Sequence, residues 1–189
     1  MNRTDALKIV DELVKSSNMR KHCLAAEAAM GSLWGYFDKK GKVDWGSREE
    51  WGIVGLLHDA DYEVTNKSLD LHTEETTKKL KEITAPKEII DSIRGHCDKE
   101  PRKLIAAKAI YAADELTGLI VAAALVRPDK KIEGLTVDSV LKRFKEPSFA
   151  KGANRDQIKT CESELGLKLE EFTGMILESM KKIAKSLGL

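Results

Sequence analysis

The sequence predicts an all-α protein, and three observations lead to that prediction. Apolar residues recur at the three- and four-residue spacing of amphipathic helices along most of the chain. Ala, Leu, Lys and Glu, which favour helices, are abundant, whereas there are only four prolines. No segment shows the alternation of apolar and polar residues that marks a strand. With 189 residues and no internal repeat, the chain is expected to form one helical bundle over 1–189, large enough to bury a core without disulfides.

Five helices are expected in the first half of the chain. Their positions, in order, are the segment after the N-cap Thr4, residues 18–37, the segment that starts with the capping box Ser47 to Glu50, the segment after His72, and a helix from Pro86 to about Cys97. Residues 38–46 and 61–71 are polar and are expected to be loops.

The second half begins with a long helix that reaches Val126 and has Pro101 in its first turn. The end of this helix is apolar nearly all round, which predicts the central, buried helix of the bundle. Three shorter helices should follow it: Thr136 to Lys145, Asn154 to Leu165, and 170–187.

Composition excludes several classes of protein. Lys and Arg number 32 against 31 Asp and Glu, so no charge excess points to a nucleic acid polymer or an anionic membrane. The longest apolar run, 118–126, is far shorter than the ~20 residues that span a bilayer. The acidic N-terminal residues do not resemble a signal peptide. Three cysteines without a CxxC spacing (Cys23, Cys97 and Cys161) are expected to be free thiols, so we expect a cytoplasmic protein.

The first chemical signal is the pair His58-Asp59, which follows the apolar stretch 53–57. A charged carboxylate after such a stretch is costly to bury without a partner. Imidazole and carboxylate groups are ligands for Fe, Mn, Zn or Co, so a metal ion is the simplest partner. Adjacent helical residues point about 100° apart, so both reach one ion only if it lies beside the helix end.

Further polar candidates occupy inward-facing helical positions or helix starts: His22, His72, His96 and Asp114. Taken singly, each has an ordinary alternative, such as a hydrogen-bonded core histidine, a surface histidine, or an aspartate that caps a helix or pairs with a lysine. Together, however, all four histidines of the chain fall into one ordered pattern with two aspartates, which favours a shared site.

This ordered set, His22 … His58-Asp59 … His72 … His96 … Asp114, resembles the motif of the HD-domain metal-dependent phosphohydrolases, an all-α superfamily. The flanking residues are similar too, including Gly55 to Leu57 before the His-Asp pair. The resemblance covers about 18–130 and leaves 131–189 as a C-terminal helical extension.

The resemblance implies a set of metal ligands. His22, His58, Asp59 and Asp114 would hold a first ion, and His72 and His96, with Asp59 bridging, would hold a second. The implied cofactors are divalent metal ions, two per chain, with Fe or Mn favoured and Co, Ni, Zn or Mg also allowed by the ligand types. Two neighbouring ions bind a phosphate oxygen and lower the pKa of a water between them.

Two departures from the family pattern concern the residues after the His-Asp pair. Ala60-Asp61 stands where several relatives have Ile-Gly, and Asp61 to Glu63 replaces a lysine that some members use near the phosphate. With Asp59, Asp61 is expected to take part in catalysis. Asp61 and Glu63 would assist proton transfer or orient a ligand histidine, and a solvated acidic loop is the alternative.

Positive charge for an anionic substrate must therefore come from other residues. Arg20, Lys21 and Arg94 flank the ligand candidates in sequence. Lys151 and Arg155 lie on a glycine-bearing loop within 127–159, a segment with nine Lys or Arg against five Asp or Glu. We expect these five cations to bind substrate, with ordinary surface charge as the alternative for the loop.

The leading hypothesis is a hydrolase that cleaves a phosphate ester or phosphoanhydride of a nucleotide or another small phosphorylated substrate. A di-iron oxygenase built on the same fold is the alternative among enzymes. A nucleotide-binding regulatory module without turnover, or a purely structural helical protein, is the alternative outside enzymes. An oligomer is compatible with the sequence.

Overall fold

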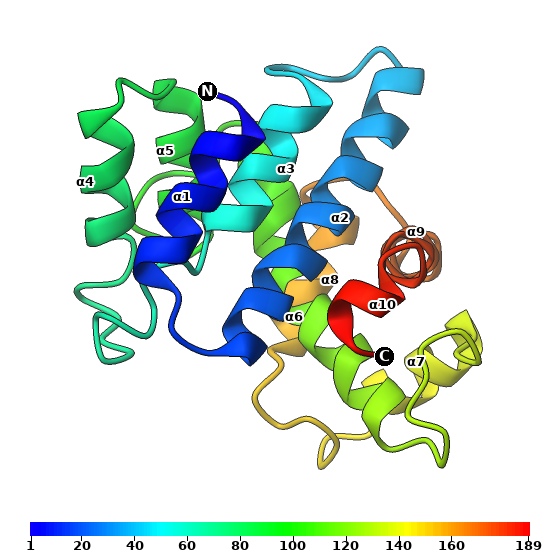
Figure 1. Ribbon diagram of the computed structural model, residues 1–189. Helices are drawn as coiled ribbons and strands as arrows, with labels where there is room; N and C mark the ends of the chain where they lie inside the picture. The colour runs from blue at the N-terminus through cyan, green and yellow to red at the C-terminus, as the bar shows by residue number, and fades with distance from the viewer.

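Ten helices and the turns between them make up the structure, a computed structural model that describes residues 1–189 (Figure 1). The helices are α1 (Arg3–Leu13), α2 (Ser17–Lys39), α3 (Arg48–Leu57), α4 (Glu74–Glu82), α5 (Lys87–Gly95), α6 (Ile105–Leu125), α7 (Val137–Phe144), α8 (Arg155–Ser163), α9 (Leu169–Lys181) and α10 (Ala184–Leu187). The predicted all-α class is confirmed.

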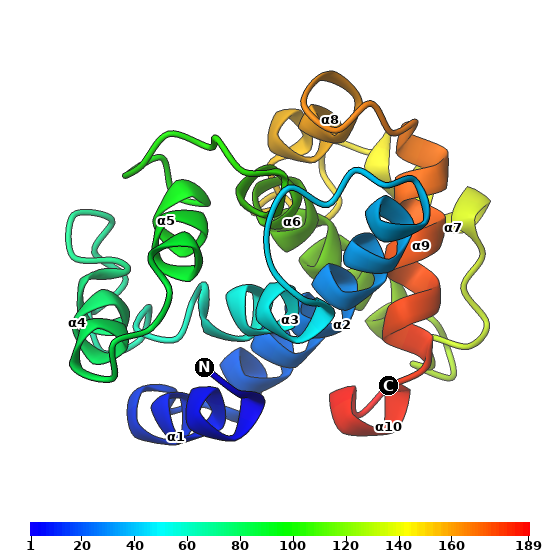
Figure 2. The same cartoon turned by 90° about the horizontal axis from the view of Figure 1, so that it is seen from above.

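The two longest helices, α2 and α6, pack against each other in the middle of the molecule, and α3 packs against both (Figures 1 and 2). Helix α6 is rich in alanine and buries most of its residues, as expected for a central helix. The side of α2 with Ala25, Ala26 and Ala29 is also fully buried. Small side chains on these faces let the helix axes approach closely.

Gly55 is the tightest point between α2 and α3. A Cβ atom at this position would lie 2.5 Å from the carbonyl oxygen of Ala26 and 2.8 Å from the backbone nitrogen of Glu27. Only glycine fits between two backbones this close. Because His58 follows three residues later, this contact also fixes how far the end of α3 lies from α2.

Most of the expected helices are present, with two differences in the second half. Pro101 lies outside α6, which begins at Ile105, where the backbone N–H donates to Asp44 Oδ2 at 2.8 Å. A side chain from the 38–46 connection thus supplies the cap. The last expected helix is two helices, α9 and α10, with a break at Ile183, whose backbone is not helical.

The C-terminal segment packs on the same core as the rest of the chain. Helix α8 packs against α6, and α9 packs against α2 (Figure 2). Phe172, Ile176 and Met180 of α9 belong to one cluster of 44 buried apolar residues that includes members of α1 to α6. Residues 131–189 therefore help to hold α2 and α6 in place.

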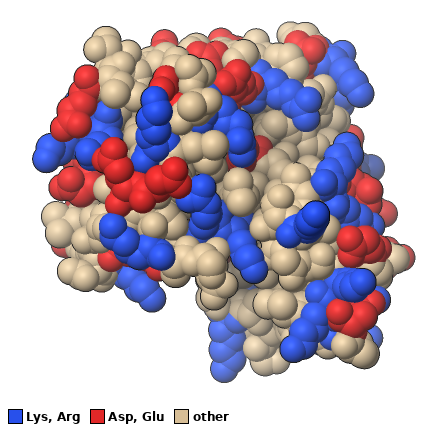
Figure 3. Space-filling view, in the orientation of Figure 1, with Lys and Arg blue, Asp and Glu red and all other residues tan.

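The surface carries both signs of charge. On the face shown in Figure 3, Lys and Arg side chains alternate with Asp and Glu side chains, in keeping with the balanced composition. None of the helices combines the length and the apolar character needed to cross a lipid bilayer.

Candidate metal centre

Four of the predicted ligands meet where α2, the end of α3 and α6 come together. His22 Nε2 lies 3.1 Å from His58 Nε2 and 3.0 Å from Asp114 Oδ1. His58 Nε2 lies 3.2 Å from the same Asp114 oxygen, and Asp59 Oδ2 is 3.4 Å from His22 Nε2. The four side chains form one group that could hold a metal ion.

The other two histidines form a second group beside the first. His72 Nε2 and His96 Nε2 are 3.0 Å apart. Asp59 Oδ1 lies 3.2 Å from the first of these nitrogens and 3.3 Å from the second. One oxygen of Asp59 thus faces each pair of histidines, which is the arrangement expected of a bridging carboxylate.

The far ring nitrogen of three histidines is fixed by an acceptor. His58 Nδ1 donates to the carbonyl oxygen of Gly55 at 2.8 Å, and His96 Nδ1 donates to the carbonyl oxygen of Ile93. His72 Nδ1 lies 3.0 Å from Asp61 Oδ1. With the proton held on Nδ1, a neutral imidazole presents the Nε2 lone pair to the centre of the group, as metal-binding histidines do.

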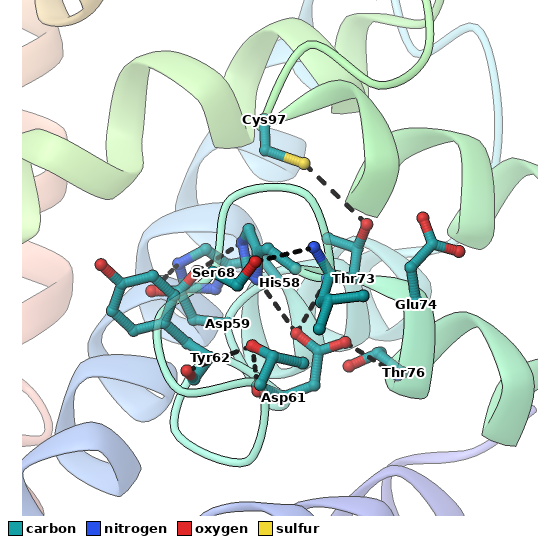
Figure 4. A network of polar contacts seen from close by, with 12 residues as sticks. His58, Asp59, Asp61, Tyr62, Ser68, Thr73, Glu74, Thr76 and Cys97 are labelled. Carbon is teal, nitrogen blue, oxygen red and sulfur yellow. Dashed lines mark hydrogen bonds and ion pairs between the residues drawn. The ribbon is translucent and has the colours of Figure 1, made fainter.

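Asp61 supports His72, one of the two histidines of the second group (Figure 4). Its side chain is fully buried. Oδ1 accepts the backbone N–H of Thr73 at 2.8 Å as well as facing His72, and Oδ2 accepts the backbone N–H of Thr76 at 3.0 Å. Thr73 has φ of 67° and its own side chain does not cap α4, so Asp61 supplies the missing cap.

This arrangement favours one of the expected roles of Asp61. Both carboxylate oxygens are engaged away from the cavity, so the side chain orients His72 and is not placed to exchange a proton with a substrate. Glu63 is engaged elsewhere: its Oε2 accepts the backbone N–H groups of Lys15 and Ser16, just before α2.

The histidines and aspartates of the cluster stabilise each other's charged forms. Burial opposes the charged form of His22, but the hydrogen bonds and charges of Asp114 and Asp59 outweigh it and raise the pKa of His22 to about 10. His72 behaves in the same way: burial opposes protonation, and Asp59 and Asp61 raise its pKa to about 9. Burial alone would raise the pKa of Asp59 and Asp114, yet the surrounding imidazoles hold both pKa values below their usual range.

The donor set fits divalent metal ions. In each group two Nε2 atoms face each other at 3.0–3.1 Å. In the metal-free protein the proton on His22 or His72 can lie between the two Nε2 atoms of its pair, and a metal cation can take the place of that proton and satisfy both lone pairs. The Asp59 and Asp114 carboxylates supply the negative charge that a divalent ion requires.

The cluster opens into a cavity of about 590 Å³. Five of the six predicted ligands line it, and His58 lies fully buried behind them. Tyr62 and Leu69 from the 58–73 turns, Tyr111 and Glu115 from α6, and residues at the start of α8 line the rest. A small substrate can therefore reach the ligands from solvent.

None of the five cations expected to bind substrate lines this cavity: Arg20, Lys21, Arg94, Lys151 and Arg155. Three are occupied by other groups. Arg20 pairs with Asp11, Arg94 lies 2.9 Å from Glu74, and Arg155 donates to backbone carbonyls of its own loop, including Ala150 and Ala153 at 2.6 Å.

The other two lie elsewhere on the surface. Lys21 Nζ is beside Gly188 near the C-terminus, and Lys151 is exposed in a turn. Closeness in sequence to a ligand did not indicate closeness to the site, because the long side chains of Arg20 and Lys21 leave α2 in other directions.

Sequence reasoning missed several residues at the centre. Cys97, predicted only as a free thiol, lines the cavity and forms a group with His72 and His96 whose possible ligand atoms lie within 4.8 Å of one another. Its position next to His96 was the available signal. Tyr111 and Glu115 flank Asp114 on α6, but nothing in the sequence indicated which of them faces the cavity.

A comparison with family models agrees with this geometry. The HD-domain model matches residues 20–119, more than half of the chain, and this range contains all six predicted ligands. The chain belongs to the HD-domain family. The predicted membership is confirmed, and the His and Asp clusters of this HD domain are able to hold metal ions. Neither the curated proteins nor the solved structures that were searched contain a match.

Proposed function

We propose that this HD domain is a metal-dependent phosphohydrolase that acts on a small phosphorylated substrate, such as a nucleotide. The observation that carries the proposal is the pair of facing histidine groups with one Asp59 oxygen turned to each. A site for a single structural ion would not need a carboxylate shared between two sets of imidazoles.

The residues divide between two ions. His22, His58 and Asp114, with Asp59 Oδ2, would hold the first. His72 and His96, with Asp59 Oδ1, would hold the second. Two ions so placed supply Lewis-acid stabilisation of phosphate oxygens and lower the pKa of a bound water.

The side chains of the protein orient the reaction. Asp59 fixes the spacing of the two groups, since both of its oxygens are used. Asp61 keeps the Nε2 atom of His72 turned inward by accepting from Nδ1. Tyr62 and Tyr111 line the cavity beside the ligand cluster, so a substrate bound there would have its phosphate at the ligand cluster and its organic part against the tyrosines.

The decisive experiment combines metal analysis with two activity assays. Protein purified without a chelator or affinity-tag nickel is expected to hold about two ions per chain by elemental analysis. Phosphate release is then screened with phosphomonoesters and nucleotides, alongside oxygen uptake, with Asp59→Ala as the inactive control.

Each outcome has a clear meaning. Phosphate release that depends on metal and is lost in Asp59→Ala supports the proposal. Oxygen uptake without phosphate release replaces it with the oxygenase alternative. Bound metal with neither activity, but with ligand binding, identifies a regulatory module. A chain that takes up no metal even after anaerobic reconstitution with Fe or Mn overturns the proposal.

A further inference from the structure

One wall of the cavity comes from outside the region that matches the HD-domain model. Asn154 and Gln157, at the start of α8, line the cavity together with Tyr111 and Glu115 of α6. Figure 2 shows α8 next to α6, and the two helices pack against each other. This C-terminal segment therefore contributes to the site as well as to the core.

Two hydrogen bonds tie this wall together. Gln157 Nε2 donates to the carbonyl oxygen of Tyr111 at 2.9 Å, and the backbone N–H of Asn154 donates to Glu115 Oε2 at 3.0 Å. Asn154 is also the N-cap of α8, with its Oδ1 accepting two backbone N–H groups. Glu115 is thus held in place through Oε2, while its second oxygen, Oε1, is left for a ligand.

No lysine or arginine near this wall pairs with Glu115. Arg102 stacks on the ring of Tyr111, with its guanidinium carbon 3.7 Å from the ring centre, but its nitrogens bond to Glu164 and Asp98. Lys99 Nζ bonds to backbone carbonyls and to Glu74. The chain therefore offers Glu115 a backbone N–H and no lysine or arginine, and the imidazole of His22, whose charge does act on Glu115, is already paired with Asp59 and Asp114.

We propose that Glu115 determines substrate specificity by accepting hydrogen bonds from hydroxyl or ammonium groups on the organic part of a phosphomonoester. This inference rests on the proposed function, because it places the phosphate at the metal cluster.

Charge balance supports the assignment. Two divalent ions, less the charges of Asp59 and Asp114, leave a net charge that a phosphomonoester dianion neutralises. Asp98, which also lines the cavity, is paired with Arg102, and Asp61 is hydrogen-bonded behind His72. Glu115 is then satisfied by a donor group on the same substrate, since a carboxylate at a half-buried site is costly to leave without a donor. A ligand without such a donor removes the water that hydrogen-bonds to Glu115 and does not replace those hydrogen bonds, so it should bind more weakly.

Three isosteric probes test this without turnover. They are 2-aminoethylphosphonate, 2-hydroxyethylphosphonate and propylphosphonate, which differ only in a terminal ammonium, hydroxyl or methyl group. Isothermal titration of metal-loaded protein is expected to show the first two binding about tenfold more tightly than the third, the effect of one charge-assisted hydrogen bond. Equal affinity for all three would overturn the proposal.

Variants of Glu115 identify the group responsible. Glu115→Leu should make the three affinities equal, and Glu115→Gln should remove most of the preference for ammonium while keeping some for hydroxyl. Glu133→Leu, an exposed position away from the cavity, is the matched control and should leave the preferences unchanged. If Glu115→Leu does not fold, the Gln variant decides, and an undiminished ammonium preference in it contradicts the proposal.

A parallel assay separates the two levels of inference. Phosphate release from ethanolamine phosphate and propyl phosphate tests the hydrolase proposal. If phosphate is released from both esters at equal rates and the three probes bind equally, the specificity role of Glu115 is wrong and the hydrolase proposal stands. If the probes bind selectively but no phosphate ester is hydrolysed, the role of Glu115 in binding stands and the hydrolase proposal is wrong.

Discussion

The two halves of the candidate metal centre are built in different ways. The half with His22, His58 and Asp114 takes its ligands from α2, the end of α3 and α6, and these helices pack on one another through small residues in the core. The half with His72 and His96 takes its ligands from a run of turns before α4 and from the C-cap of α5. Helix packing positions the first half, whereas local hydrogen bonds position the second: His72 is held by the buried carboxylate of Asp61, and His96 is held by the carbonyl oxygen of Ile93.

This difference predicts how each half fails. Disturbing the contact between α2 and α3 should damage the first half and the fold together, because the same contact serves both. Disturbing Asp61 should loosen the second half and leave the core intact. Asp59 belongs to both halves, and its loss would not distinguish them.

The largest effect is expected from Gly55→Ala. The new Cβ would lie 2.5 Å from the Ala26 carbonyl oxygen. Because this contact is with the backbone of α2, it can be relieved only if α2 and α3 move apart. Overpacking of this kind costs about 1–3 kcal/mol. Separation also moves His58 from His22, so the first ion should be lost along with activity.

Denaturant unfolding and elemental analysis check this result. Gly35→Ala on α2 is the matched control, because its Cβ would have no neighbour within 4 Å. The control should gain up to about 1 kcal/mol, since alanine is the better helix former. A Gly55→Ala protein with unchanged stability and two ions would show that helix packing does not position the first half.

Asp61→Asn should act on the second half alone. Asparagine keeps the shape but cannot accept from His72 Nδ1 and from both backbone N–H groups at once. Removing a carboxylate that supports a metal-binding histidine lowers metal affinity by about 10- to 100-fold. We expect one ion to dissociate in a chelator titration while the other stays.

The matched control for Asp61→Asn is Glu75→Gln, an exposed carboxylate in the first turn of α4. It should keep both ions at the affinity of the parent protein. If Asp61→Asn loses both ions equally, the two halves do not bind metal independently, and Asp59, which faces both, couples their affinities.

The sequence predicted the first half more completely than the second. Apolar periodicity located α2, α3 and α6, and the ordered histidines and aspartates indicated which polar side chains the fold brings together. For Asp61 the sequence left open whether it assists proton transfer or orients a histidine. The answer depends on the turn that brings the backbone N–H groups of Thr73 and Thr76 to its oxygens, and no periodicity describes such a turn. The start of α6 was predicted too early for a similar reason, because its cap comes from the distant Asp44.

The five cations show a different limit. A long, flexible side chain pairs with whichever carboxylate or carbonyl the fold brings near it, as Arg94 does with Glu74. Nearness in sequence to a ligand carries no information about that choice. The residues that do line the cavity beside the ligands, such as Glu115 and Gln157, come together only when α8 packs on α6.

Raising the pH should weaken the metal-free protein in both halves. The pKa values of His22 and His72, about 10 and about 9, lie above the value of 6.5 that is usual for histidine, so protonation of both stabilises the fold. That contribution is fully present below the unfolded pKa and disappears as the pH rises through about 9 to about 10. Bound metal takes the place of these protons, so the metal-loaded protein should not show the same loss.

Unfolding by denaturant from about pH 6 to about pH 10.5, with and without a chelator, measures the difference between the two forms. The gap in stability between loaded and metal-free protein should widen as the pH rises. A gap that stays constant would show that these two histidines are not protonated in the metal-free fold.

The smallest effect is expected from Cys97→Ser, which tests whether the second half has a further ligand. Cys97 Sγ is near His72 and His96, but it donates to the carbonyl oxygen of Arg94 at 3.4 Å and contacts Thr73 Oγ1 at 3.9 Å. Burial raises the pKa of the Cys97 thiol, and a protonated thiol is a poor ligand. Serine keeps the donor, so the variant should retain both ions and change activity less than about twofold.

Cobalt-substituted protein gives a direct spectroscopic check, since a thiolate ligand produces an intense near-ultraviolet band that the serine variant would lack. If that band is present in the parent and one ion is lost in the variant, Cys97 is a ligand, and the half built from turns depends on three protein side chains besides Asp59.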